Sequence, residues 1–210
     1  MLAFTLAVFF LIITPGPGVL SAAGVGAGFG FRAGLAYVAG LFLGNNLVAF
    51  AVVSGLAGLL FSVPYVRTVL FAVSLGYLFY IATKIAFAGS KLAFIHSEKS
   101  PGFLGGVALQ PINPKAYVVN TTFFTGFPFW ADNLVGEIAI KFLIMNMIWL
   151  PIHLLWLYAG FSLHRLDLSK NAHMAINIAM AVAMLLVVII AAVATLYSDP
   201  NTVSLETQVN

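Results

Sequence analysis

The chain contains two helix-breaking stretches, Thr14-Pro15-Gly16-Pro17-Gly18 and Pro111-Ile112-Asn113-Pro114-Lys115, and each interrupts an apolar run long enough to cross a membrane. A hydrocarbon core of about 30 Å holds no water. Every N–H and C=O group that a proline releases there therefore needs a partner in the protein or in a water-filled cavity. A chain that breaks two membrane helices in this way is expected to build a binding site at the breaks.

The composition is that of an integral membrane protein. Of the 210 residues, 62% are hydrophobic and only 7% are charged, and the mean hydropathy is +1.07. A water-soluble domain carries about 25% charged residues. Cysteine is absent, which excludes disulfides, thiolate metal sites and cysteine nucleophiles. The net charge of +3 comes from a few loop residues, so the expected surroundings are a lipid bilayer and no nucleic-acid partner is indicated.

Apolar windows of about 20 residues predict six transmembrane helices. Their predicted ranges are 2–24, 34–60, 65–89, 103–128, 135–161 and 172–197. Because the loops are short, residues 1–210 are expected to form one all-α transmembrane domain with a polar tail at 198–210. The first run has the apolar core of a signal peptide, but no Lys or Arg precedes Leu2, so cleavage is not expected.

Basic residues are distributed unevenly between the predicted loops. The loops after the first, third and fifth helices hold six of the nine Lys and Arg residues, namely Arg32, Lys84, Lys91, Lys99, Arg165 and Lys170. On the opposite side lie Arg67 and Lys141. The positive-inside rule therefore predicts that these three loops face the cytoplasm and that both termini lie on the outer side of the cell (inner) membrane.

Six spans divide into two sets of three, 1–90 and 103–197, which must be inserted in opposite orientations because three is odd. Pro17 and Pro114 are 97 residues apart, and each break lies in the first helix of its half. Interrupted helices at corresponding positions of the two halves are typical of inverted-repeat transporters. We therefore expect two inverted three-helix repeats, with the first and fourth helices broken near the bilayer midplane.

Both breaks have the sequence of a helix that restarts. Asn113 is a favoured N-cap residue and Pro114 suits the first helical position, while either Thr14-Pro15 or Gly16-Pro17 can do the same in the first helix. A restarted helix points free N–H groups and the positive end of its dipole at the midplane, which favours an anion such as a carboxylate.

Lys115 falls near the middle of a predicted span. Its burial there costs about 2.5 kcal/mol or more on insertion scales, so it is a functional candidate and the expected partner of a carboxylate. The alternative is that its ammonium group reaches an interface or pairs with nearby carbonyl groups. Carbonyls around Ile12, Ile13 and Ile112, at the ends of the interrupted half-helices, are expected to accept hydrogen bonds from the ammonium group of a ligand.

Asn45 and Asn46 lie in the second span at the same depth as the breaks. They are expected either to contribute to the site or to form hydrogen bonds between helices. The candidate substrate-binding residues are Pro15, Gly16, Pro17, Asn45, Asn46, Asn113, Pro114 and Lys115. Further polar residues in the spans are Gln110, Asn120, Asn146, His153 and Asn177.

Two further patterns concern packing and charge. Glycines spaced by four predict close helix packing, at the pairs Gly24 and Gly28, Gly26 and Gly30, Gly30 and Gly34, and Gly40 and Gly44. No Asp or Glu lies deep in a span. Glu137, near the outer start of the fifth helix, is the nearest titratable candidate, and it is spaced to pair with Lys141.

Several of these segments together resemble the LysE/RhtB amino-acid exporter superfamily. They are Pro15-Gly16-Pro17, the segment Gly40–Asn46, Leu75-Gly76-Tyr77-Leu78, and Asn113-Pro114-Lys115 followed by Phe123-Phe124. The resemblance runs from the first to the fourth predicted helix and implies a small six-helix inner-membrane exporter of amino acids or related metabolites. It also implies that the Pro-Gly-Pro and Asn-Pro-Lys residues occupy signature positions. Two departures, Asn45-Asn46 where members often have an acidic residue and an atypical start to the last helix, leave substrate and coupling open.

The function expected from the sequence is secondary transport of an amino acid or a similar small amphoteric solute out of the cell by alternating access. The alternatives are a membrane scaffold that transports nothing, a membrane-embedded enzyme, or an exporter of another small solute or cation. An enzyme is not expected, because paired acids, a His cluster or an activated nucleophile at one depth are lacking. His164 and His173 have no third ligand, so neither a metal site nor a cofactor is expected. Glycine-rich helix faces are compatible with a homodimer.

Overall fold

The computed structural model describes residues 1–63, 66–86 and 100–165, together with isolated positions between 171 and 186. Throughout these residues the only regular structure is helical. The helices are α1 (Leu2–Ile13), α2 (Pro17–Phe29), α3 (Phe31–Val53), α4 (Leu56–Ser62), α5 (Val66–Ala86), α6 (Gly102–Ile112), α7 (Pro114–Thr125) and α8 (Leu134–Arg165). Most of the predicted sixth span, 172–197, lies outside the described residues, as do the tail 198–210, the loop residues Lys91, Lys99 and Lys170, and His173 and Asn177.

Two of the described helices, α3 and α8, are long and apolar enough to cross a membrane. The number rises to three if α1 and α2, whose axes differ by 48°, form one bent span. The described residues thus fit an integral membrane protein built of helices. That the chain has six spans, and that its two halves are inverted repeats, stay predictions.

Two glycines with positive φ set helix boundaries that differ from the predicted ones. Gly30 (φ 83°) is the single residue between α2 and α3, and a Cβ there would meet no atom of the described residues within 4 Å. The predicted packing role of Gly30 is therefore wrong, because its part is to turn the chain. Gly55 (φ 77°) ends the second predicted span early, so that α3 stops at Val53 and the short helix α4 follows.

Glycines bring α3 and α6 into backbone contact. A Cβ on Gly40 would collide with the carbonyl of Phe103, and one on Gly106 would collide with the carbonyl of Tyr37. At Gly44 a Cβ would lie 2.8 Å from the Val107 carbonyl oxygen. The close packing predicted for the pair Gly40 and Gly44 is confirmed.

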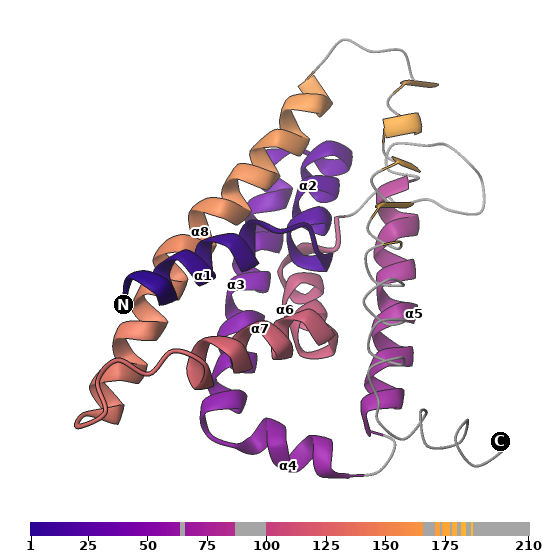
Figure 1. Ribbon diagram of the computed structural model, residues 1–210. Helices are drawn as coiled ribbons and strands as arrows, with labels where there is room; N and C mark the ends of the chain where they lie inside the picture. Colours follow the sequence, from indigo (N-terminus) through magenta and orange to yellow (C-terminus); the bar gives the residue numbers. More distant parts are fainter. Residues whose placement is uncertain are drawn as a thin grey trace, which may run out of the picture.

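The same kind of contact joins α2 to α8. A Cβ on Gly26 would collide with the carbonyl of Leu157, and one on Gly160 would collide with the carbonyl of Ala23. Helices in membranes associate through such small residues, because burying apolar surface gives no advantage over lipid. α3 also packs on α7, and α8 also packs on α1. Each of the two long helices therefore contacts one pair of half-helices (Figure 1).

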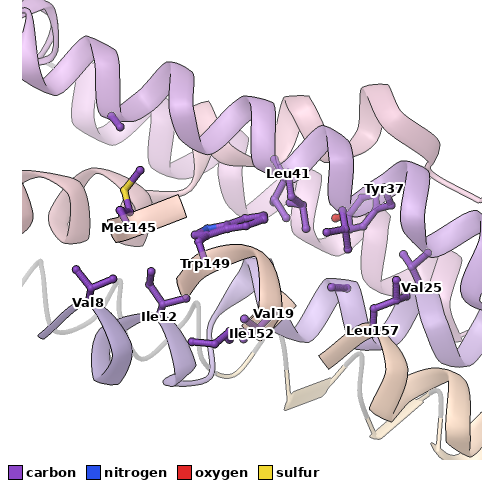
Figure 2. Close-up of a cluster of buried hydrophobic side chains, with 14 of the residues drawn as sticks. Val8, Ile12, Val19, Val25, Tyr37, Leu41, Met145, Trp149, Ile152 and Leu157 are labelled. Atoms are coloured by element: carbon purple, nitrogen blue, oxygen red, sulfur yellow. The ribbon is translucent and has the colours of Figure 1, made fainter. Parts of the chain in front are cut away.

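Burial differs from that of a water-soluble protein. Apolar residues from α1, α2, α3 and α8 form the cluster shown in Figure 2, yet several large apolar side chains point outward, with Leu104 78% and Val135 79% exposed. Polar and charged side chains are buried beside this apolar cluster, namely Ser21, Asn45, Gln110, Asn113, Asn120, Glu137, Lys141 and His153. Charged residues are almost never buried unless paired, and an exposed apolar surface suits contact with lipid.

The predicted Glu137–Lys141 pair forms inside the protein. The Lys141 ammonium lies 2.8 Å from Glu137 Oε1, and both side chains are almost fully buried. Glu137 Oε2 accepts hydrogen bonds from the backbone N–H groups of Phe129 (2.8 Å) and Trp130 (2.6 Å). This carboxylate therefore fastens the connection between α7 and α8 onto the start of α8.

Aromatic rings cover the cation of this pair. Lys141 Nζ lies 5.7 Å from the ring centre of Phe4 and 5.6 Å from that of Phe129, and it donates a hydrogen bond to the Phe124 carbonyl at 3.3 Å. Cation–π contacts of this kind strengthen when the cation is removed from water. The N-terminal half-helix α1 is thereby attached to α7 and α8.

Gly40→Ala is expected to separate α3 from α6, because the added Cβ meets backbone that cannot move independently of its helix. Overpacking of this kind costs about 1–3 kcal/mol, so the thermal unfolding midpoint of the detergent-solubilised protein should fall by several degrees. Gly76→Ala is the matched control, since a Cβ at this helical position meets no described atom within 4 Å. Equal midpoints for the two variants would contradict the contact.

Glu137→Gln should destabilise the protein by about 3–5 kcal/mol, because it leaves the Lys141 ammonium buried without a counter-charge. The double variant Glu137→Gln/Lys141→Met removes that charge and should recover most of the loss. Thermal unfolding followed by circular dichroism measures both. A double variant as unstable as the single one would show that the ion pair is not the cause.

Candidate substrate site

The first break separates α1 from α2. Gly16, with extended backbone (φ −168°, ψ 176°), is the N-cap of α2, and Pro17 is its first residue. Of the two starts that the sequence allows, the helix therefore uses Gly16-Pro17. No side chain of the described residues caps α2. The N–H groups of Gly18 and Val19 consequently lack an acceptor within the helix.

The second break consists of Asn113 between α6 and α7. The Asn113 side chain accepts a hydrogen bond from the Lys115 backbone N–H at 3.1 Å, and Pro114 occupies the first helical position. The N-cap predicted here is confirmed. Asn113 Nδ2 also donates to Gln110 Oε1 at 3.2 Å, which ties the cap to the preceding half-helix. The two breaks thus differ, because α7 has a side-chain cap and α2 has none.

Lys115 connects the two breaks. Its ammonium donates a hydrogen bond to the Thr14 carbonyl at 2.6 Å, and a Cβ on Gly16 would lie only 2.8 Å from Lys115 Cδ. Of the two roles that the sequence leaves open for Lys115, pairing with a carbonyl is the one seen in this conformation. An ammonium group has three donors, so two remain for another partner.

Two carbonyl groups at the breaks, those of Thr14 and Pro111, accept hydrogen bonds from protein side chains. They adjoin the carbonyls around Ile12, Ile13 and Ile112, whose predicted role toward the ammonium group of a ligand stays a prediction. The Pro111 carbonyl accepts a hydrogen bond from the Tyr117 hydroxyl at 2.8 Å. Side chains of α7 therefore satisfy a carbonyl at each break.

A small cavity of about 50 Å³ lies between the breaks. Gly16, Asn45, Asn113 and Lys115 from the predicted set line it. The other four predicted residues, Pro15, Pro17, Pro114 and Asn46, are not part of its wall. The three prolines shape the breaks without facing the cavity, so they act through the backbone.

The neighbouring residues Asn45 and Asn46 have different roles. Asn46 and Asn146 exchange two hydrogen bonds, at 3.1 and 2.8 Å, which joins α3 to α8. For Asn46, the interhelical alternative is thus the one observed. Asn45 is buried in the cavity wall, where its Oδ1 accepts a hydrogen bond from Asn120 Nδ2 at 3.2 Å.

The sequence did not place α8 in the site, yet Met145, Trp149 and His153 line the cavity. Figure 2 shows Met145 and Trp149 in one cluster with residues of α1 and α2. The Trp149 and His153 rings stack with centroids 3.4 Å apart, and His153 Nδ1 lies 2.9 Å from the Trp149 carbonyl. Their spacing of four residues places them on one helix face. This spacing is the sequence feature that could have indicated that they lie together in the site.

Gln110 and Asn120 also line the cavity. A Cβ on Gly18 would lie 3.4 Å from Gln110 Nε2 and 3.2 Å from His153 Nε2, so these side chains crowd the start of α2. No group of three or more His, Asp or Glu residues that could hold a metal ion occurs within the part of the chain that the structure describes. The cavity wall is instead composed of amides, one lysine, one histidine, one threonine, glycines and apolar side chains.

Comparison with known families identifies the chain. A family model described as LysE type translocator matches residues 9–198. The chain belongs to the LysE-type translocator family. The resemblance seen in the first four predicted helices is confirmed, and the match extends it through the fifth and sixth predicted spans. Members of this family are membrane transporters rather than enzymes.

One curated relative is the leucine efflux protein of Enterobacter sp. (strain 638), which is 24% identical to this chain over 135 residues. The match covers 59% of this chain and 61% of the relative, so the translocator spans less than two thirds of the relative's length. No solved structure matches the sequence.

Asn113→Ala should destabilise the translocator by about 1 kcal/mol, because α7 loses the side chain that accepts the Lys115 N–H. Asn113→Ser is the matched control, since serine caps helices about as well as asparagine. Thermal unfolding in detergent is the measurement. If serine proved as damaging as alanine, the cap would not explain the loss.

Proposed function

We propose that this chain is a secondary transporter that exports a small apolar amino acid, with leucine as the first candidate, across the cytoplasmic membrane by alternating access. The observation that carries the proposal is the position of Lys115. Its ammonium lies at the wall of the cavity between the two breaks, beside the uncapped start of α2.

The start of α2 and Lys115 together suit a carboxylate. Gly18 and Val19 line the cavity, and their N–H groups have no acceptor within the helix. A helix N-terminus carries partial positive charge, and the lysine adds a full charge next to it. A carboxylate that took the place of the Thr14 carbonyl as acceptor would exchange a neutral partner of the ammonium for a charged one, which gives a stronger hydrogen bond.

Apolar residues in the cavity wall suit an aliphatic side chain. They are Leu11, Ile12, Val19, Val119, Phe123 and Met145. The related leucine efflux protein points to the same kind of substrate. Small-molecule sites in general combine a mostly apolar wall with a few polar groups that fix orientation.

Helix pairing supports alternating access between two inverted halves. α3 packs on α6 and α7, and α8, its counterpart in the second half, packs on α1 and α2, the counterparts of α6 and α7. A cavity of about 50 Å³ holds only a few water molecules, whereas ligand sites measure about 300–1,000 Å³. Binding an amino acid therefore requires the cavity to widen, and movement of the two halves relative to one another is the way that alternating access provides.

The remaining features of the proposal follow from the sequence. Six spans in the inner membrane, with both termini on the outer side, accord with the basic loops. In the described part of the cavity wall no Asp or Glu is present. The proposal therefore does not include coupling to protons, which is tested by measuring transport with and without a pH gradient.

Lys115→Met should lower the flux of labelled leucine from loaded proteoliposomes by about 10- to 100-fold, because the charged hydrogen bond to the carboxylate is lost. Lys115→Arg is the matched control, since it keeps the positive charge and should retain part of the flux. Thermal unfolding in detergent verifies that each variant is folded. An unchanged flux in Lys115→Met would overturn the role of this lysine.

The wild-type protein tests the proposal more broadly. A panel of labelled amino acids, each measured with and without an imposed pH gradient, should show flux for leucine and similar apolar amino acids. Flux for no amino acid under either condition would overturn the transporter proposal and favour a membrane protein with another role.

A further inference from the structure

Asn120, on α7, carries an acceptor without a partner in the wall of the cavity. The side chain is only 1% exposed, and its Oδ1 is buried and accepts no hydrogen bond from the described residues. Buried polar atoms in folded proteins are nearly always hydrogen-bonded, so an exception calls for an explanation. Since Asn120 lines the cavity, a ligand that widens the cavity on binding can supply the missing donor.

Two neighbours fix the orientation of the Asn120 amide. Its Nδ2 donates to the Ala116 carbonyl at 2.8 Å and to Asn45 Oδ1 at 3.2 Å. Turning the amide over would place Oδ1 against the Ala116 carbonyl, which is an acceptor in every case. The unpaired atom is therefore the oxygen, and the partner it lacks must be a donor.

The charges around the cavity provide no counter-ion for an ammonium group. Lys115 is the charged residue of the described wall, and it lies by the uncapped start of α2. With no carboxylate in that wall, an ammonium group that enters the cavity has to be held by neutral acceptors. An acceptor already buried and oriented, as Asn120 Oδ1 is, binds an ammonium without losing further side-chain entropy.

Lys115 and Asn120 both line the same small cavity. One amino acid bound there can therefore meet the lysine with its carboxylate and the asparagine with its ammonium group.

We propose that Asn120 Oδ1 accepts a hydrogen bond from the ammonium group of the substrate and so makes the transporter select amino acids over simple carboxylates. Asn45 acts as a positioning residue, since its Oδ1 holds the Asn120 amide from α3. This inference rests on the proposed function, in which Lys115 and the start of α2 receive the carboxylate.

The test compares leucine with 4-methylpentanoate, which has the same carbon chain and carboxylate but no ammonium group. Both compete with labelled leucine for the detergent-solubilised protein. The wild type should prefer leucine by at least about tenfold. Asn120→Leu keeps a similar side-chain volume. It should weaken the binding of leucine by about tenfold and leave the binding of 4-methylpentanoate almost unchanged, so that the preference nearly disappears.

Asn146→Leu is the matched control. It removes an amide of the same size that also joins two helices, but the partner of Asn146 is Asn46 and neither residue lines the cavity. The preference for leucine should survive in this variant. Loss of the preference in both variants would overturn the specific role of Asn120.

Other results separate the inference from the proposed function. Equal binding of leucine and 4-methylpentanoate by the wild type would overturn the inference without any variant, so the test does not depend on the folding of Asn120→Leu. A preference retained in Asn120→Leu would also overturn it. Binding of both ligands lost in Lys115→Met, with only leucine weakened in Asn120→Leu, would support both proposals. No leucine binding by the wild type would overturn both.

Discussion

The structure depends on how backbone groups released at two helix breaks are satisfied in apolar surroundings. At the first break the Thr14 carbonyl accepts a hydrogen bond from the Lys115 ammonium. At the second break the Pro111 carbonyl accepts one from the Tyr117 hydroxyl. Both donors come from α7, whose own first turn is capped by Asn113. Because the Lys115 contact crosses from one half of the chain to the other, it holds the two breaks together and defines the space between them.

Glycine contacts determine how closely the rest of the bundle approaches that space. Backbone meets backbone where Gly40 and Gly106 join α3 to α6, and where Gly26 and Gly160 join α2 to α8. In lipid, such approach replaces the apolar side-chain burial that stabilises water-soluble bundles. It allows polar side chains of several helices to meet at the cavity while large apolar side chains also face outward.

The two breaks share a sequence pattern but not a chemistry. Asn113 caps the N-terminus of α7, whereas the start of α2 at Gly16 has no side-chain cap and lies beside Lys115. On the proposed function, the carboxylate binds near α2 and the unpaired oxygen of Asn120 marks where the ammonium binds. Two breaks of similar sequence would thereby form a site with unlike ends, as a substrate with unlike ends requires.

The sequence by itself determined the features that depend on near neighbours along the chain. Membrane class, the two breaks, the Asn113 cap and the ion pair of Glu137 with Lys141 all follow from residue type and spacing within a few positions. Only the tertiary structure decided that Asn45 faces the cavity while Asn46 bonds to another helix, and that His153 of α8 completes the wall. The physical reason is that the rotation of a helix about its axis is set by contacts between residues about 100 positions apart, which local sequence does not encode.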